Sequence, residues 1–198
     1  MIKNYIFDLG NVVLILRWDK ILDKYNINNQ EKDLLNKHIF ESDEWVKLDE
    51  GTISKKEAID IMKSNLPENL HSICEDIMNS WHSGLVINNE IIDLINEMRE
   101  KGYNTYVLSN APLDIDEFLE ENDLKKYFDG IILSAFDKML KPNKEIYDLL
   151  LDRFKLNADE CYFIDDKKIN IEGAKAQGID GFVFDYKNIR DLRNCINL

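Results

Sequence analysis

The sequence of 198 residues has no apolar stretch that reaches the ~18 residues needed to span a bilayer. It also has no run of lysine and arginine, and its 38 acidic residues against 25 basic ones give a formal net charge of −13. A net charge of this sign repels phosphate backbones and anionic lipid unless a local basic patch overrides it. We therefore expect neither a nucleic acid nor a membrane as partner.

Cysteine is scarce and scattered, because Cys74, Cys161 and Cys195 show no paired spacing. This pattern argues against a disulfide framework and against a zinc site, and it favours reduced thiols. The first residues, "MIKNYIFDLG", lack the apolar region and the small-residue cleavage site of a secretory signal. We expect a soluble, cytoplasmic protein.

What is present is a clear alternation of strand and helix patterns. Short runs rich in β-branched and aromatic residues predict five strands, "YIF" at 5–7, "TYVLS" at 105–109, "GIILS" at 130–134, "CYFI" at 161–164 and "GFVF" at 181–184. Helical patterns separate the last four runs, and such alternation is typical of a parallel sheet with crossover helices. The sequence therefore predicts a three-layer α/β core with a five-stranded parallel sheet, in which the strands at 5–7 and 161–164 are central.

The interval after the first strand differs, because only helix patterns occur from about residue 15 to residue 86. One helix opens with a Ser-x-x-Glu capping box, Ser54 to Glu57, and "NLHSICEDIMNSW" repeats apolar residues at helical spacing. We predict a core domain of residues 1–14 and 87–198 and a helical cap domain of residues 15–86. The tryptophans at 18, 45 and 81 all fall in the cap, where we expect them to form its core.

Polar residues follow the predicted strands where ligands bind in open parallel sheets, at the carboxyl ends. They are Asp8, Ser109-Asn110, Lys141 and Asp165-Asp166. Three carboxylates at one edge repel one another unless a cation lies among them, and Mg²⁺ suits oxygen ligands. A lysine and a hydroxyl stabilise a phosphoryl group, and a free carboxylate can act as nucleophile. The set predicts a phosphoryl-transfer site.

The stretches "FDLGNVV", "VLSNA", "KPNKEIY" and "YFIDDKKINIEGA" resemble the four motifs of the haloacid dehalogenase superfamily, whose core is Rossmann-like. The helical insertion resembles the four-helix-bundle cap of that superfamily. The resemblance implies that Asp8 is the nucleophile and that Ser109 and Asn110, with neighbouring amides, bind the phosphate. It also implies that Lys141 neutralises the phospho-intermediate.

The resemblance implies in addition that Mg²⁺ is bound by Asp8, Asp166 and the backbone carbonyl of Gly10. Asp165 either ligates the metal directly or positions a water molecule. Asn170 is expected to brace this loop.

Gly10 departs from the pattern, because most phosphatases of the superfamily carry a second aspartate two residues after the nucleophile. Three explanations stay open: a leaving group that needs little help, such as an anomeric or acyl phosphate; a proton from a cap residue or an ordered water; or inefficient turnover. The "DLGN" form resembles a branch that includes sugar-phosphatases acting on glucose 1-phosphate, which favours the first two. We expect a Mg²⁺-dependent phosphatase for a small phosphorylated metabolite, a sugar phosphate, that works through an aspartyl-phosphate.

Two alternatives remain: a catalytically impaired phosphate-binding or regulatory protein, and a 2-haloacid dehalogenase. Dehalogenases also lack the second aspartate, but they typically place tyrosine there and use no metal. In the cap, Asp19, Trp45, Asp49 and Glu50 are candidates to face the cleft, although a polar loop with a glycine turn explains "DEG" at 49–51 more simply. The sequence leaves the particular ester and the oligomeric state open.

Overall fold

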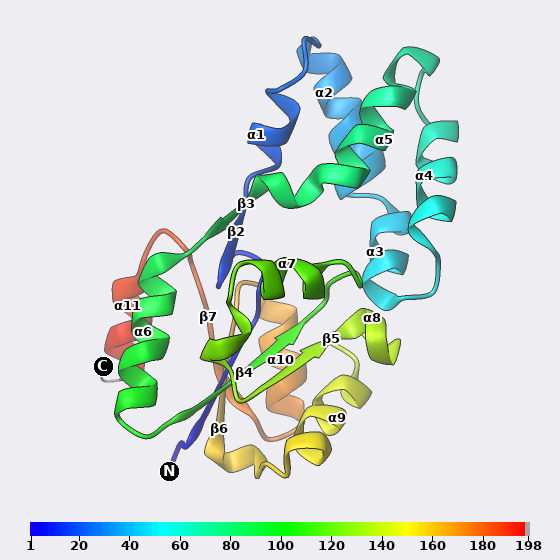
Figure 1. Ribbon diagram of the computed structural model, residues 1–198. Helices are drawn as coiled ribbons and strands as arrows, with labels where there is room; N and C mark the ends of the chain where they lie inside the picture. The colour runs from blue at the N-terminus through cyan, green and yellow to red at the C-terminus, as the bar shows by residue number, and fades with distance from the viewer. Residues whose placement is uncertain (197–198) are drawn as a thin grey trace.

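The computed structural model describes residues 1–196, and its centre is a parallel sheet of five strands (Figure 1). The order across the sheet is β5 (Gly130–Leu133), β4 (Asn104–Ser109), β1 (Asn4–Phe7), β6 (Cys161–Asp165) and β7 (Asp180–Val183). The predicted five-stranded sheet is confirmed, and each strand lies within one residue of its expected bounds. β1 is the middle strand, paired with β4 and with β6.

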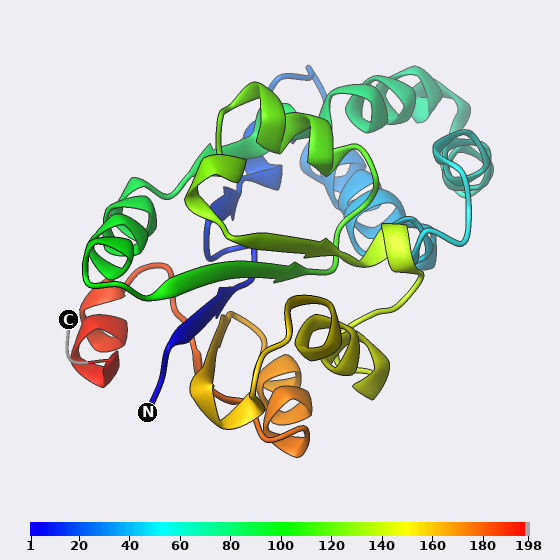
Figure 2. The same cartoon turned by 60° about the horizontal axis from the view of Figure 1, so that its bottom comes forward.

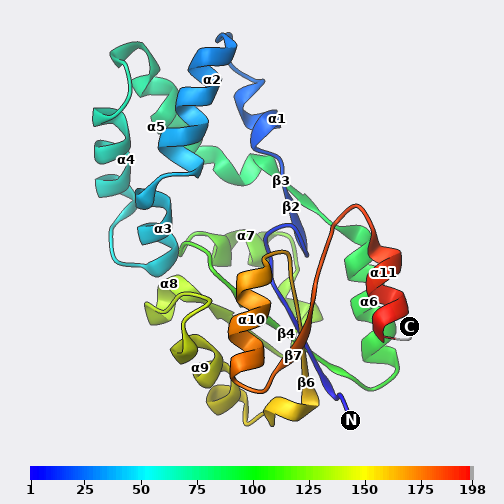
Figure 3. The same cartoon turned by 180° about the vertical axis from the view of Figure 1, so that it is seen from behind.

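Helices cover both faces of the sheet (Figures 2 and 3). One face carries α6 (Asn89–Glu100), α7 (Ile115–Glu121) and α11 (Ile189–Ile196), and the other carries α9 (Lys144–Phe154) and α10 (Lys168–Ala176). Successive side chains of a strand point to opposite faces, so β1 needs apolar residues on both. Phe7 packs on the α6 side and Ile6 on the α9 side, and both are fully buried.

A helical segment, here called the insertion, separates two short strands, β2 (Leu14–Leu16) and β3 (Leu85–Ile87). Its helices are α1 (Trp18–Leu22), α2 (Asn29–Leu35), the π-helical turn η1 (Asn36–Phe40), α3 (Asp43–Glu50), α4 (Lys55–Ser64) and α5 (His71–Ser80). Figure 1 shows them on one side of the sheet, beyond the carboxyl ends of its strands. The predicted capping box is confirmed, because Ser54 and Glu57 close the start of α4 reciprocally.

The two strands β2 and β3 form an antiparallel pair that connects the insertion to the rest of the chain. The expectation of helix alone from residue 15 to residue 86 was therefore wrong at both ends. Strands of three residues are too short to display the alternation that identifies a strand in a sequence.

The remaining elements are short: α8 (Ser134–Asp137) after β5, and the 3-10 turns η2 (Glu68–Leu70), η3 (Trp81–Gly84), η4 (Lys125–Tyr127) and η5 (Ala158–Glu160). α8 matters for the site because α3 of the insertion packs against it. Among the described helices, none has the length and apolar character that a bilayer crossing requires.

Candidate active site

The polar residues that the sequence places after the strands do converge at the carboxyl edge of the sheet. Asp8 follows β1, Ser109 ends β4 and precedes Asn110, Asp165 ends β6 and precedes Asp166, and Lys141 lies in the loop between α8 and α9. They come together because parallel strands all end at the same edge. Except for Asn110 and Asp166, which are half-buried, all of these residues are buried.

Lys141 lies between two carboxylates. Its Nζ is 2.9 Å from Oδ1 of Asp8 and 2.6 Å from Oδ2 of Asp165, and it donates a hydrogen bond of 2.9 Å to the carbonyl of Leu108. Burial by itself lowers the pKa of this ammonium, but the two carboxylates outweigh burial and the pKa is raised. The lysine is therefore charged and fixed in direct contact with Asp8.

Asn110 holds the loop that carries this lysine. The backbone N–H of Lys141 donates to Oδ1 of Asn110 at 2.8 Å, and Nδ2 of Asn110 donates to the carbonyl of Lys141 at 2.9 Å. The side chain of Asn110 thus positions Lys141, while the residue also lines the cavity described below.

Asp8 carries a shifted pKa. Burial raises it to about 6, the charge of Lys141 lowers it, and the charge of Asp165 raises it again. Its Oδ1 accepts a hydrogen bond of 2.8 Å from the backbone N–H of Leu9. At neutral pH this carboxylate is ionised, shielded from bulk water and oriented by neighbouring donors.

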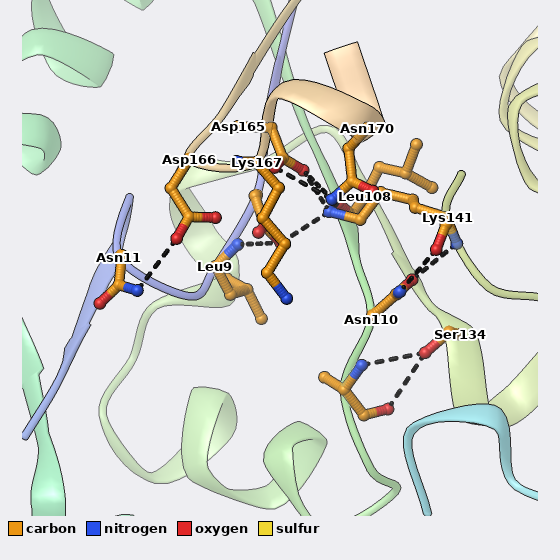
Figure 4. Close-up of polar contacts among 12 residues, drawn as sticks. Leu9, Asn11, Leu108, Asn110, Ser134, Lys141, Asp165, Asp166, Lys167 and Asn170 are labelled. Atoms are coloured by element: carbon orange, nitrogen blue, oxygen red, sulfur yellow. Dashed lines mark hydrogen bonds and ion pairs between the residues drawn. The ribbon is translucent and has the colours of Figure 1, made fainter. Parts of the chain in front are cut away.

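The two aspartates at the end of β6 have different surroundings (Figure 4). Both oxygens of Asp165 accept hydrogen bonds within the protein, from Lys141, from the amide of Asn170 at 3.0 Å and from the backbone N–H of Lys167 at 2.8 Å. Asp166 accepts one side-chain bond, 3.0 Å from Nδ2 of Asn11, and it lines the cavity. Burial raises the pKa of Asp166.

One carboxylate oxygen each of Asp8, Asp165 and Asp166 lies within 4.8 Å of the other two. An all-oxygen anionic donor set of this kind matches the preference of hard divalent cations such as Mg²⁺. Lys141 compensates part of the negative charge, and a cation beside Asp8 and Asp166 would compensate the rest.

A cavity of about 340 Å³ opens above this cluster, between the sheet edge and the insertion. On the insertion side and its β2–β3 connection, the lining consists of Leu14, Leu16, Trp18, Phe40, Trp45, Val46, Asp49, Trp81 and Leu85. Trp18 stacks on Phe40 with ring centroids 4.2 Å apart, and the three tryptophans contact one another. They form an aromatic core, as predicted, and they also wall the cavity.

Two polar residues that line the cavity, Asn11 and Lys167, had no predicted role in the site. Asn11 and Lys167 stand inside the recognised motifs, beside Gly10 and Asp166, so their position was a usable signal. Asp49 was a candidate to face the cleft, with a polar loop as the simpler interpretation; it belongs to the last turn of α3 and lines the cavity. The other cap candidates differ: Trp45 lines the cavity, whereas Asp19 pairs with Arg17 on the surface, 2.6 Å apart.

Comparison with known proteins is consistent with this geometry. A family model described as haloacid dehalogenase-like hydrolase matches residues 5–184. A sesquiterpene phosphatase from Aspergillus oryzae is 28% identical over 180 residues, which cover 90% of this chain and 88% of the relative. A D-ribitol-5-phosphate phosphatase from Bacteroides thetaiotaomicron is 28% identical over 200 residues, which cover 92% of this chain and 91% of the relative.

A solved structure is also similar over most of its length. It is a haloacid dehalogenase family enzyme from Bacteroides thetaiotaomicron in complex with magnesium and inorganic phosphate. The TM-score is 0.70 at 26% sequence identity, and the match covers 92% of this chain and 93% of that chain.

Proposed function

Because the chain belongs to the haloacid dehalogenase-like hydrolases, and to their phosphatase-like branch, we propose that it hydrolyses a small organic phosphate monoester through an aspartyl-phosphate. The observation that carries this proposal is the buried ion cluster at the cavity floor, in which Lys141 contacts both Asp8 and Asp165. A carboxylate fixed beside a cation, under a cavity of substrate size, suits nucleophilic attack on phosphorus.

In this proposal Asp8 is the nucleophile. Its carboxylate oxygen forms a bond to phosphorus while the bond from phosphorus to the ester oxygen breaks. Lys141 compensates the negative charge on the phosphoryl oxygens, and the hydroxyl of Ser109 with neighbouring backbone amides binds the same oxygens. Asn110 contributes by holding Lys141 in place. Water then hydrolyses the aspartyl-phosphate.

We propose Mg²⁺ as the cofactor, held by Asp8, Asp166 and the backbone carbonyl of Gly10. We assign Asp165 to positioning, because both of its oxygens already accept hydrogen bonds from Lys141, Lys167 and Asn170. When bound, the ion supplies positive charge for the phosphoryl oxygens.

We also propose that residues 15–86 act as a cap domain on a core of residues 1–14 and 87–198. The cavity in which substrate would bind lies between these two parts. Movement of the cap about β2 and β3 would admit substrate and then exclude water.

The organic part of the substrate would contact the insertion. That side of the cavity is mainly aromatic and aliphatic, and Asp49 is its one ionisable side chain within residues 1–196. A sugar phosphate, as the "DLGN" resemblance implies, fits this wall through the C–H face of its ring, and an isoprenoid or aryl phosphate fits it more fully. Of the two relatives, one is named a sesquiterpene phosphatase, and the other is named for D-ribitol 5-phosphate, an open-chain polyol phosphate without a ring.

The test is phosphate release from sugar phosphates, a prenyl monophosphate, acetyl phosphate and p-nitrophenyl phosphate, with Mg²⁺ and with EDTA. We expect release that needs Mg²⁺ and that disappears in Asp8→Asn. The control is Asp43→Asn, which makes the same change on an exposed residue at the start of α3 and should keep full activity.

Folded protein that releases no phosphate from any of these esters would contradict the proposal and favour a phosphate-binding or regulatory role. Halide release from a 2-haloacid without added metal would instead identify a dehalogenase.

A further inference from the structure

The cavity contains one carboxyl group that the proposed nucleophile and metal site do not use. Its ionisable lining residues, within the part of the chain that the structure describes, are Asp8, Asp49, Lys141, Asp166 and Lys167. Asp8 and Asp166 already have roles in the proposed site, and Lys141 and Lys167 carry no carboxyl group. Asp49 remains, on the side where the leaving group of a substrate would lie.

The backbone of Asp49 is attached to the core. The hydroxyl of Ser134, at the start of α8, donates a hydrogen bond to the carbonyl of Asp49. Gly51, which ends α3 with φ 72°, lies so close to α8 that a Cβ on it would be 2.2 Å from the carbonyl oxygen of Ala135. These contacts fix the end of α3 over the site.

The side chain of Asp49, in contrast, has a free hydrogen-bonding capacity. Its Oδ1 is shielded from solvent and has no hydrogen-bond partner among residues 1–196. A buried polar atom without a partner is costly and uncommon, and in a cavity it indicates a group that meets a ligand.

The burial of Asp49 favours its neutral form. Burial raises the pKa of Asp49 to about 8; Lys167 and Lys141 lower it, while Asp8 and Asp114 raise it. Asp49 therefore carries a proton at neutral pH, as a general acid requires. This is the proton that a carboxyl group two residues after Asp8 would supply if residue 10 were not glycine.

We propose that Asp49 is the general acid and base of the reaction, supplied by the insertion in place of the residue missing at Gly10. This rests on the proposed function. As Asp8 bonds to phosphorus, the Asp49 carboxyl group gives its proton to the departing ester oxygen, which leaves as an alcohol. In the second step the Asp49 carboxylate takes a proton from the water that attacks phosphorus; phosphate leaves, and Asp8 is again a free carboxylate.

Leaving-group dependence tests this role, because an alkoxide needs a proton to depart whereas p-nitrophenolate and acetate do not. For Asp49→Asn we expect kcat/KM for an alkyl phosphate to fall by about 10²–10⁴. For p-nitrophenyl phosphate and acetyl phosphate kcat/KM should fall less than about tenfold, since it reports phosphorylation of Asp8 and not the later hydrolysis. The control is Glu50→Gln, the matching change from carboxylate to amide on the next residue. Glu50 is not among the residues that line the cavity and accepts a hydrogen bond from the hydroxyl of Thr52, so both values should stay unchanged.

Two further measurements distinguish proton transfer by Asp49 from a purely structural role of its side chain. The alkyl phosphate kcat/KM of wild type should fall above about pH 8, as Asp49 loses its proton, and this limb should be absent in Asp49→Asn. Gly10→Asp should restore part of the alkyl phosphate activity to Asp49→Asn, because a Cβ at residue 10 meets only Cδ1 of Leu16, at an ordinary 3.5 Å.

An equal loss for alkyl and aryl esters in Asp49→Asn, or no loss for either, would overturn the role of Asp49. Failure of the proposed function is a different result, namely no phosphate release by wild type or full release by Asp8→Asn. In that case ¹³C NMR of labelled aspartate still decides the state of Asp49: a carboxyl resonance that titrates near pH 8 should be present in wild type and absent from Asp49→Asn.

Discussion

At the scale of single residues, the site depends on how a buried charge is compensated. Lys141 has a side chain only 1% exposed, and its contacts with Asp8 and Asp165 bring together three charges that would each be costly to bury alone. Such a cluster contributes little net stability compared with apolar packing, but removing one member leaves the others uncompensated. Stability alone therefore does not explain the cluster, which is consistent with a role in function.

Lys141→Met provides the corresponding stability prediction. The substitution keeps most of the side-chain volume but leaves Asp8 and Asp165 without their cation, so we expect the free energy of unfolding at neutral pH to fall by about 3–5 kcal/mol. Urea denaturation followed by circular dichroism measures it. The matched control is Lys56→Met, in an ion pair with a lysine side chain 85% exposed, where the change should stay within about 0.5 kcal/mol. Similar effects of the two substitutions would show that the buried cluster does not need Lys141.

At the scale of elements, the position of α3 depends on its contact with α8. Two glycines with positive φ allow the effect of this contact to be distinguished from the strain of the backbone conformation alone. A Cβ on Gly51 would clash with the backbone of Ala135, whereas a Cβ on Gly102, with φ 88°, would meet nothing within 4 Å.

Gly51→Ala and Gly102→Ala should therefore differ. Each pays about 1–2 kcal/mol for a left-handed alanine, but only Gly51→Ala must also push α3 away from α8. We expect Gly51→Ala to lose more unfolding free energy and to lower alkyl phosphate hydrolysis, because α3 carries Asp49, while Gly102→Ala keeps wild-type activity. Equal losses in the two variants, by thermal denaturation and by phosphate release, would mean that the α3–α8 contact does not position the site.

The elements also differ in how well the sequence predicts them. The core strands were recognisable because β1, β4 and β6 are buried on both faces and are therefore runs of apolar residues bounded by polar ones. β2 and β3 were not, since three residues contain too little periodicity. The convergence of Asp8 and the Asp165-Asp166 pair was predictable because both lie at the end of a strand in a recognisable motif, and that of Lys141 because it belongs to the motif "KPNKEIY".

Asp49 could not be identified in the same way. Its environment is made by Ser134, Lys167 and other residues far away in the chain, and only the docking of α3 brings them together. Its local sequence, acidic residues before a glycine, is that of an ordinary helix end.

At the scale of the whole molecule, the cavity between the insertion and the sheet makes the stability of the fold depend on pH, because it buries the carboxyl group of Asp49. The pKa of Asp49 is raised from an ordinary value of 3.8 to about 8, so between these values the folded protein binds a proton that the unfolded chain releases. The stabilising contribution of such a group is fully present below about pH 4 and is lost as the pH rises through about 8. Folding therefore becomes less favourable over this interval because of one side chain.

This contribution of Asp49 is tested by measuring the unfolding free energies of wild type and Asp49→Asn in EDTA from about pH 5 to about pH 9. Asparagine does not titrate, so the variant should gain stability relative to wild type as the pH rises. Each pKa unit corresponds to about 1.4 kcal/mol, and the total gain should be on the order of a few kcal/mol. Asp8, whose pKa is also raised, is present in both proteins, so its own titration cancels in the difference apart from its coupling to Asp49. A difference that is constant with pH would mean that Asp49 is ionised throughout, and a carboxylate without a proton could not serve as the acid.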